Sequence, residues 1–382
     1  MIKSGFKLSL IFFCFLFCFC APGNNSQETI APGVEHLHYI DNQQPWSIHI
    51  LKIDLTEPSV NITTTLAFDR TSGNERLTEQ VGRRHRANEQ AVAAINADFF
   101  GISGVPAGLQ IIDGVPVRES TAHSVFALTP ANKPIIAKVR NQAQVIFKNG
   151  RRLKINGINR IRHANETILY NQYKGANTET NNWGLEIVLY FPEPFAIGRL
   201  NRGTIAAFTE NQGNHAIPPR NGCVLSTHGE AAKSIAQMIK TGDAVSLDIQ
   251  FPPIQSPIKT AIGGIPRIIR DGRISVEMRE EGIQPQFAET RHPRTAIGFT
   301  RDERTLFMLT VDGRQRNHSA GMTLHELAAF MLRLGCYQAL NLDGGGSTTM
   351  VIHDKIVNRP SDPIGERAIA NGLVVLSTAS LQ

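Results

Sequence analysis

The C-terminal third of the chain contains the stretch that decides the fold, TLFMLTVDGRQRNHSAGMTLHELAAFMLRLGCYQALNLDGGGSTT at residues 305–349. The apolar run at 305–311 predicts a buried strand, and the amphipathic segment 323–334 predicts a helix. A second apolar run at 338–342 predicts another strand. Two strands of one sheet joined by a crossover helix run parallel, with a right-handed connection. We therefore expect one strand–helix–strand unit near the C-terminus.

Two aspartates stand where these strands end. Asp312 follows the first strand and Asp343 follows the second. Because parallel strands end at the same edge of a sheet, the two carboxyl groups should lie roughly 5 to 10 Å apart, one or two strand spacings. Paired carboxylates suit general acid and general base catalysis. Asp312 and Asp343 are therefore the candidate catalytic residues.

A glycine-rich run follows the second aspartate and is formed by Gly344, Gly345, Gly346, Ser347 and Thr348. Such a run turns sharply and exposes backbone N–H groups, which hold phosphate oxygens in many proteins. It lacks the Gly-Lys-Ser/Thr ending of a nucleotide-binding P-loop. The run therefore predicts phosphate binding and disfavours nucleotide hydrolysis.

Three further polar residues stand next to predicted buried strands. Arg294 precedes an apolar strand, and arginine is the natural bidentate partner of a phosphate. Asn96 and Asp98 follow another buried strand and precede two phenylalanines. An asparagine or aspartate at such a place often only closes a turn. We expect Arg294, Asn96 and Asp98 to contribute to a substrate site.

The rest of the sequence predicts many strands and few helices. Turn residues bound the expected strands at 47–53, 145–147, 185–191 and 244–251, and helical patterns cover 78–90 and 230–240. No internal repeat of 20 to 50 residues is visible. These patterns predict an α+β fold: a mixed, mainly antiparallel central sheet with a few packed helices and the C-terminal strand–helix–strand unit.

Composition and charge narrow the function classes. The 382 residues are 41% hydrophobic and 19% charged, with 32 Gly and 20 Pro, which is typical of a loop-rich globular protein. The net charge is +6, but the densest basic cluster, at 83–86, has no interleaved aromatic residues on which bases could stack. We therefore expect no nucleic-acid partner.

The N-terminus has the pattern of an export signal. Lys3 and Lys7 precede an apolar run at 8–20 that is too short to span a membrane, so we expect a signal over 1–22 and a polar linker over 23–35. Cys20 could carry a lipid anchor. The protein should be exported, as a secreted, periplasmic or membrane-anchored lipoprotein.

Two cysteines remain after this signal. Cys223 and Cys336 could form one disulfide in an oxidising compartment, but two separate buried thiols are the simpler expectation. Residues 36–89 should form a strand-rich segment packed on the main domain.

Five ordered motifs resemble the phosphodiester glycosidase family. They are Asn96-Ala97-Asp98-Phe99-Phe100, Arg291-His292-Pro293-Arg294-Thr295-Ala296-Ile297-Gly298, Val311-Asp312-Gly313-Arg314-Gln315, the segment from Ser319 to Ala328, and the segment from Asn341 to Thr348. The resemblance is strongest from Arg291 onward and implies a family domain over 90–378. It also implies hydrolysis of a glycosyl phosphodiester, with release of a sugar and a phosphomonoester.

The residues fit that chemistry. A phosphate is a good leaving group, so catalysis depends on holding it while positive charge develops on the sugar carbon. On this interpretation Arg294, the glycine-rich backbone and a second guanidinium, Arg314, hold the phosphate. Asp312 and Asp343 stabilise or attack the sugar and handle the proton of water. The substrate would be a glycosyl phosphate or a polysaccharide of the exopolysaccharide type.

Two alternatives remain open. Asp98, Asp312 and Asp343 together could hold a divalent cation, Ca²⁺ or Mg²⁺, which would make the protein a metal-assisted phosphodiesterase. The chain could also be a non-catalytic, exported glycan-binding protein. A third carboxylate, Glu326, is explained without catalysis, because it has the spacing of a capping box with Thr323.

Overall fold

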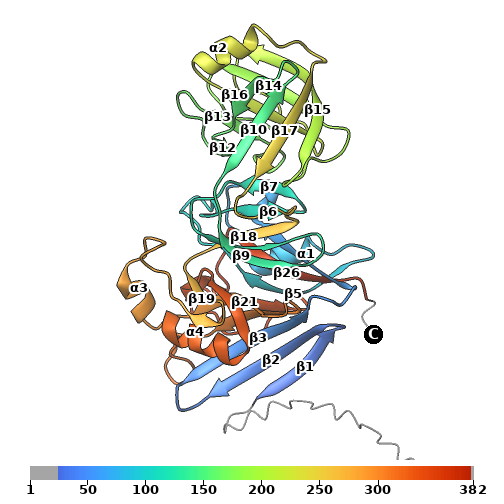
Figure 1. The fold of residues 1–382 in the computed structure, drawn as a ribbon. Helices are drawn as coiled ribbons and strands as arrows, with labels where there is room; N and C mark the ends of the chain where they lie inside the picture. The colour runs from blue at the N-terminus through green and yellow to red at the C-terminus, as the bar shows by residue number, and fades with distance from the viewer. Residues whose placement is uncertain (1–24, 380–382) are drawn as a thin grey trace, which may run out of the picture.

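The computed structural model describes residues 25–379, which form 26 strands, four α-helices and two short 3-10 helices (Figure 1). The expected export signal over 1–22 and the anchor candidate Cys20 lie outside these residues. The α-helices are α1 (Leu77–Gly82), α2 (Glu230–Ala236), α3 (Pro285–Glu289) and α4 (Leu324–Arg333). The 3-10 helices are η1 (Ala67–Asp69) and η2 (Gly345–Ser347). None of the helices in residues 25–379 is long and apolar enough to cross a membrane.

The first sheet contains the C-terminal unit. Its order is β1-β2-β3-β22-β21-β23-β19-β20. The strands in this order are β1 (Ser26–Ala31), β2 (Val34–Asp41), β3 (Trp46–Asp54), β22 (Thr305–Val311), β21 (Arg294–Thr300), β23 (Cys336–Asn341), β19 (Arg267–Arg270) and β20 (Arg273–Ile274). Strands β22 and β23 run in the same direction because each pairs antiparallel with β21, which lies between them.

Two five-stranded sheets lie with the first sheet in the lower of the two bodies in Figure 1, which we call the lower body. One has the order β25 (Lys355–Ile356), β24 (Met350–Ile352), β5 (Gln90–Asn96), β26 (Asn371–Ser377), β4 (Val60–Leu66). The other has the order β7 (Val115–Arg118), β6 (Gln110–Ile112), β18 (Thr260–Gly264), β8 (Ser124–Leu128), β9 (Pro134–Lys138). One apolar core joins the three sheets of the lower body, with Leu51, Ile95 and Phe126 among its buried members.

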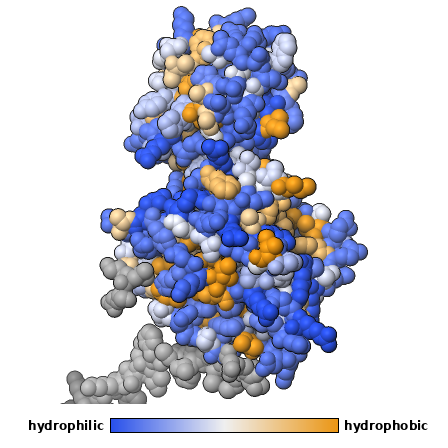
Figure 2. All heavy atoms as spheres, turned by 180° about the vertical axis from the view of Figure 1, so that it is seen from behind, coloured by the Kyte–Doolittle hydropathy of each residue, from blue (hydrophilic) through white to orange (hydrophobic). Residues whose placement is uncertain are grey.

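The upper body is the fourth sheet together with α2. Its eight strands, in order, are β11 (Arg152–Lys154), β10 (Gln142–Phe147), β17 (Ala244–Gln250), β15 (Leu200–Glu210), β14 (Leu185–Tyr190), β16 (Gly222–Thr227), β13 (Thr167–Tyr170) and β12 (Gly157–Ile158). Its apolar core continues into the lower body through Leu109 and Val125. Figure 2 shows a narrow waist between the two bodies and a mainly hydrophilic face with small, separate apolar groups.

The expectation of an α+β fold around one central sheet is wrong. The chain is mostly β, with four sheets whose strands pair antiparallel except for β12 and β13. The helix expected over 78–90 ends at Gly82, because the next residues turn back along β4, where Arg83 donates a hydrogen bond to the Leu66 carbonyl at 2.9 Å. The amphipathic helix α4 packs on one face of the first sheet, as the sequence predicts.

The polar linker expected over 23–35 is also wrong from Ser26 onward. Residues 26–31 form β1, which pairs antiparallel with β2 at the edge of the first sheet. Four of its six residues are exposed. An edge strand with one open side needs few apolar residues, so its composition resembles that of a linker.

Candidate active site

The ends of β5 and β23 meet, although the two strands belong to different sheets. The Asp343 amide donates to the Ala97 carbonyl at 2.8 Å. Asn96, at the end of β5, reinforces the junction: its Nδ2 donates to the Asp343 carbonyl at 2.7 Å, and its Oδ1 accepts from the Thr295 hydroxyl at 2.7 Å and the Thr349 amide at 3.1 Å. Asn96 is buried and its amide is fully engaged, so it positions the Asp343 loop.

The glycine-rich loop after Asp343 is tightly packed by backbone. The Gly344 amide donates to Asp343 Oδ1, and the Gly345 amide donates to the Pro293 carbonyl, both at 2.9 Å. The Ser347 and Thr348 amides bond back to carbonyls of the loop itself. Within residues 25–379 the Gly346 amide alone of these five has no acceptor. The expected cradle of several free amides is therefore reduced to one.

Two guanidinium groups lie against this loop. A Cβ atom on Gly345, whose φ is +62°, would lie 3.2 Å from Arg314 Nη1. A Cβ atom on Gly346 would overlap the guanidinium of Arg367, which is itself held by Asp362 through a bond of 2.6 Å from Nε. The two guanidinium groups thus approach the loop closely at Gly345 and Gly346. Arginine is the side chain best suited to hold a phosphate in this way.

Asp98 is the second acid of this region. Its side chain is 4% exposed and fits between Gly108 and Gly263, and the Gly108 amide donates to Oδ2 at 2.6 Å. Burial raises the pKa of Asp98 to about 7. The negative charge of Asp343 raises it further, whereas the Gly108 and Phe99 amides and the charge of Arg118 act in the opposite direction.

Asp343 has a similar electrostatic environment. Burial raises its pKa to about 6, against the effects of the Ser347 hydroxyl, the Gly344 amide and the charge of Arg367. Burial thus raises the pKa of both carboxyls toward neutrality, to about 6 for Asp343 and about 7 for Asp98. One acid and one base at neutral pH are the requirement of acid–base catalysis.

Asp312 ends β22 at the same edge but is surrounded by donors. His318 Nε2 lies 2.7 Å from its Oδ2, and Asn358 Nδ2 and the Arg359 amide each lie 3.0 Å from its Oδ1. The side chain is 1% exposed. Asp312 therefore orients His318 and fixes the chain at 358–359. Its catalytic assignment remains a prediction, since the structure places Asp98, from another sheet, beside Asp343.

Arg294 does not have the surroundings of a phosphate ligand. It is 1% exposed, and its guanidinium donates to the carbonyls of Met322, Phe287 and Thr290 at 2.8 to 2.9 Å. Its carbon Cζ lies 5.0 Å from the centre of the Phe287 ring. Burial lowers the pKa of Arg294 to about 10. These contacts connect β21 to the segment before α4 and to α3.

Arg314 is exposed and points its guanidinium at His292, whose Nδ1 lies 3.0 Å from Nη2. Burial lowers the pKa of His292, and the charges of Arg294 and Arg314 lower it further. A neutral ring can accept a hydrogen bond from the guanidinium through this nitrogen. Of the two predicted phosphate-binding arginines, Arg314 is therefore the one with an open position beside the loop.

The alternative of a divalent cation held by Asp98, Asp312 and Asp343 has no such cluster to support it in the described residues. Residues 25–379 contain no group of three or more His, Cys, Asp or Glu side chains that could hold one metal ion. Asp98 and Asp343 lie together, but the carboxylate of Asp312 is occupied by His318, Asn358 and Arg359.

Two remaining sequence-based interpretations agree with the structure. Glu326 caps α4 with Thr323: the Thr323 amide donates to the Glu326 carboxylate at 2.9 Å, and the Glu326 amide donates to the Thr323 hydroxyl at 3.1 Å. Glu326 also forms an ion pair with Arg291. Cys223 and Cys336 are separate, buried free thiols, and burial raises the pKa of both.

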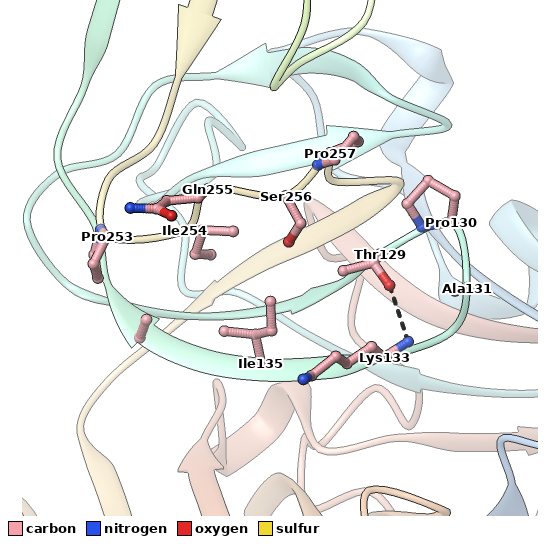
Figure 3. Close-up of a pocket in the computed structure, with 11 residues that line it drawn as sticks. Thr129, Pro130, Ala131, Lys133, Ile135, Pro253, Ile254, Gln255, Ser256 and Pro257 are labelled. Carbon is pink, nitrogen blue, oxygen red and sulfur yellow. Dashed lines mark hydrogen bonds between the residues drawn. The ribbon is translucent and has the colours of Figure 1, made fainter.

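An apolar groove of about 750 Å³ lies elsewhere in the lower body (Figure 3). It runs between the β8–β9 hairpin and residues 253–257, and the close-up shows Ile135 and Ile254 on its walls. The Thr129 hydroxyl accepts from the Lys133 amide at 3.1 Å at one end. None of the candidate residues lines this groove, so it offers no acid–base chemistry.

Comparison with known proteins gives a family match over the C-terminal half of the chain. A family model described as phosphodiester glycosidase matches residues 195–376, which include Asp343, the glycine-rich loop, Arg314 and Arg367. Over these residues, nearly half of its length, the chain is similar to the phosphodiester glycosidase family. Asp98 lies upstream of the matched segment.

Relatives and solved structures extend the comparison. The chain is 33% identical over 117 residues to bovine N-acetylglucosamine-1-phosphodiester α-N-acetylglucosaminidase. The aligned segment covers 28% of this chain and 22% of that protein. It is 42% identical over 85 residues to the SPbeta prophage-derived uncharacterized protein YomE of Bacillus subtilis. That aligned segment covers 22% of this chain and 13% of the relative. The aligned segments thus span less than a quarter of either relative.

Two crystal structures share the fold. A hypothetical protein from Synechocystis superposes with a TM-score of 0.71 at 18% identity, covering 94% of this chain and 64% of the other. A protein from Burkholderia pseudomallei superposes with a TM-score of 0.63 at 20% identity, covering 86% of this chain and 74% of the other. At such identities the likeness concerns the fold alone.

Sequence reasoning missed two residues of the site. Arg367 follows no strand and belongs to no recognised motif, and only its approach to Gly346 identifies it. His318 stands in an irregular loop, and its contact with Asp312 depends on the path of that loop. A spacing of six residues between Asp312 and His318 carries no signal of its own.

Proposed function

We propose that this protein hydrolyses the glycosidic bond of sugar-1-phosphate diesters at the site formed by Asp98, Asp343 and the glycine-rich loop. The observation that carries the proposal is the pair of neighbouring carboxyls with raised pKa values, about 7 and about 6, beside a loop approached by two guanidinium groups. The matched family and the bovine relative, an N-acetylglucosamine-1-phosphodiester α-N-acetylglucosaminidase, support the same chemistry.

In the proposed reaction water attacks the anomeric carbon and the bond from that carbon to the phosphate oxygen breaks. Asp343, ionised near neutral pH, accepts a proton from the attacking water. Asp98 keeps its proton under the same conditions and donates it to the departing oxygen. The products are the free sugar and a phosphomonoester.

Arg314 and Arg367 have the role of holding the phosphate. Their positive charges oppose the charge that collects on the phosphate oxygens as the bond breaks, and the free Gly346 amide adds one neutral donor. Arg294 acts indirectly in this scheme, by fixing β21 and so the Pro293 carbonyl that holds Gly345.

We also propose that the protein is exported and acts on cell-surface or exopolysaccharide-type glycans. The support is the signal pattern of residues 1–22, with two lysines before an apolar run. Whether Cys20 carries a lipid is read from the mass of the purified N-terminal peptide.

The test is release of free sugar from the methyl ester of N-acetylglucosamine 1-phosphate and from UDP-N-acetylglucosamine, followed by chromatography. We expect release with and without EDTA. Release that EDTA abolishes would favour metal-assisted chemistry instead. No release from these compounds or from other sugar-1-phosphate diesters, together with tight glycan binding, would favour a non-catalytic glycan-binding protein.

A further inference from the structure

A basic pocket of about 300 Å³ lies at the waist between the two bodies. The lower body contributes Thr71, Ser72 and Arg118, and the end of β12 and the loop after it contribute residues 158–161 and His163. Lys174 completes the wall. The charged side chains of the lining are all basic, so the pocket is suited to an anion.

Most of this positive charge is already compensated by neighbours outside the lining. Arg160 Nε lies 2.8 Å from Glu119 Oε1, and its Nη1 lies 2.6 Å from Glu166 Oε2. Lys174 forms an ion pair with Glu179. These ion pairs neutralise most of the positive charge of Arg160 and Lys174.

Arg118 is the exception. Within residues 25–379 its guanidinium has no ion pair and no hydrogen bond, and its Nε is buried without an acceptor. A buried donor without a partner is costly, so such groups commonly mark the place of a ligand. The hydroxyls of Thr71 and Ser72 and the ring of His163, which line the same pocket, make no side-chain hydrogen bond in the described part of the chain.

One loop connects the pocket with the proposed catalytic acid. Val105, on its wall, belongs to the loop that begins directly after Asp98 and is closed by the Ala107 amide, which donates to the Phe99 carbonyl at 2.7 Å. The charge of Arg118 also lowers the pKa of Asp98, which places the guanidinium within electrostatic range of that carboxyl. A group bound at Arg118 would therefore lie within electrostatic range of Asp98.

We propose that this pocket binds a second anionic group of the substrate, carried by the aglycone beyond the phosphodiester that is cleaved. This inference rests on the proposed function and names its substrate class: sugar phosphodiesters whose aglycone is itself anionic, such as nucleoside diphosphate sugars or glycans with repeated phosphodiester links. Arg118 supplies the charge, and Thr71, Ser72 and His163 supply neutral hydrogen-bonding groups.

The test compares two substrates with the same sugar. UDP-N-acetylglucosamine carries a second phosphate in its aglycone, whereas the methyl ester of N-acetylglucosamine 1-phosphate has a neutral aglycone. We expect Arg118→Gln to lower kcat/KM for the UDP-sugar about tenfold through KM, a loss typical of one charge-assisted contact. The methyl ester should change less than twofold. Arg202→Gln, at an exposed site in β15, is the matched control.

Two further measurements keep the outcomes distinct. Arg118→Lys should recover part of the lost KM, because it restores the charge without the planar fork. Calorimetric titration with UDP should show binding to the wild type that weakens about tenfold in Arg118→Gln. This readout needs no turnover. UDP binding without cleavage of either substrate would therefore overturn the proposed function but support the anion-binding role of the pocket.

Equal losses for the two substrates would overturn the inference, because Arg118 would then act only on Asp98. Unchanged KM for the UDP-sugar, or equal UDP affinity in wild type and Arg118→Gln, would overturn it as well.

Discussion

Asp312 and Asp343 end parallel strands at the same edge of one sheet, yet their surroundings differ. Three donors, from His318, Asn358 and Arg359, saturate the Asp312 carboxylate. Asp343 receives the Gly344 amide on one oxygen only, and burial raises its pKa to about 6. The comparison teaches that the supply of donors, and not the place on the sheet, separates a structural aspartate from a reactive one.

The substitution with the largest expected effect on activity is Asp343→Asn. We expect kcat/KM for sugar-1-phosphate diesters to fall at least about 100-fold, because the amide cannot accept a proton from water. The circular dichroism spectrum should be unchanged. A variant that keeps wild-type rates would remove Asp343 from the mechanism.

The pH dependence of the wild type should show both acids. We expect kcat/KM to rise as Asp343 ionises near pH 6 and to fall as Asp98 loses its proton near pH 7. In Asp98→Asn the alkaline limb should disappear and the maximal rate should fall by roughly 100-fold. A profile flat from pH 5 to 8 would contradict the assignment of both carboxyls.

Asp312→Asn should affect stability more than turnover. The new NH2 group would face donors from Asn358 and Arg359, and the charge opposite His318 would be lost. We expect a loss of about 2 to 4 kcal/mol in the free energy of unfolding, measured with urea. Residual kcat/KM should stay within about tenfold of the wild type. His318→Gln removes only one of these contacts, so it should lower the free energy of unfolding by less. An Asp312→Asn variant that is stable but inactive would restore Asp312 as a catalytic residue.

Stability against pH gives a smaller effect of opposite sign. Burial raises the folded-state pKa of Asp343 above its value in the unfolded chain, so its contribution to stability is present at acid pH and is lost as the pH rises through about 6. Asp343→Asn escapes this loss. We expect its melting temperature to exceed that of the wild type by roughly 3 °C at pH 8 and to match it near pH 4. A lower melting temperature at pH 8 would argue against a destabilised carboxylate.

The smallest expected effect is at the helix cap. Glu326→Gln weakens the capping box of α4 and removes the ion pair with Arg291, so it should cost about 1 kcal/mol of stability and leave kcat unchanged. Glu289→Gln is a suitable control, since Glu289 is exposed and makes no ion pair within the described chain. A large loss of turnover in Glu326→Gln would instead make it a third catalytic carboxylate.

Local patterns were sufficient for the elements and for part of the site. The apolar runs predict β22 and β23, the Thr323 and Glu326 spacing predicts the start of α4, and the crossover rule predicts that the two strands run parallel. The glycines after Asp343 mark a place of close approach, although guanidinium groups occupy it and most of the amides are used within the loop.

Long-range packing accounts for what the sequence did not reveal. The division into four sheets depends on which strands pair, and one pattern of alternation is compatible with many pairings. Arg294 is buried among carbonyls from three segments, and Arg367 reaches Gly346 from a loop. Asp98 meets Asp343 only because β5, in a different sheet, ends where β23 ends.

The most direct test of the central claim is a titration of the aspartate carboxyls, by infrared or ¹³C NMR spectroscopy of protein labelled at aspartate. We expect two carboxyls that titrate between about pH 6 and 7, one absent in Asp98→Asn and one absent in Asp343→Asn, with both present in Asp312→Asn. If both carboxyls at the glycine-rich loop titrate below pH 4, the two acids are ordinary and the account is wrong.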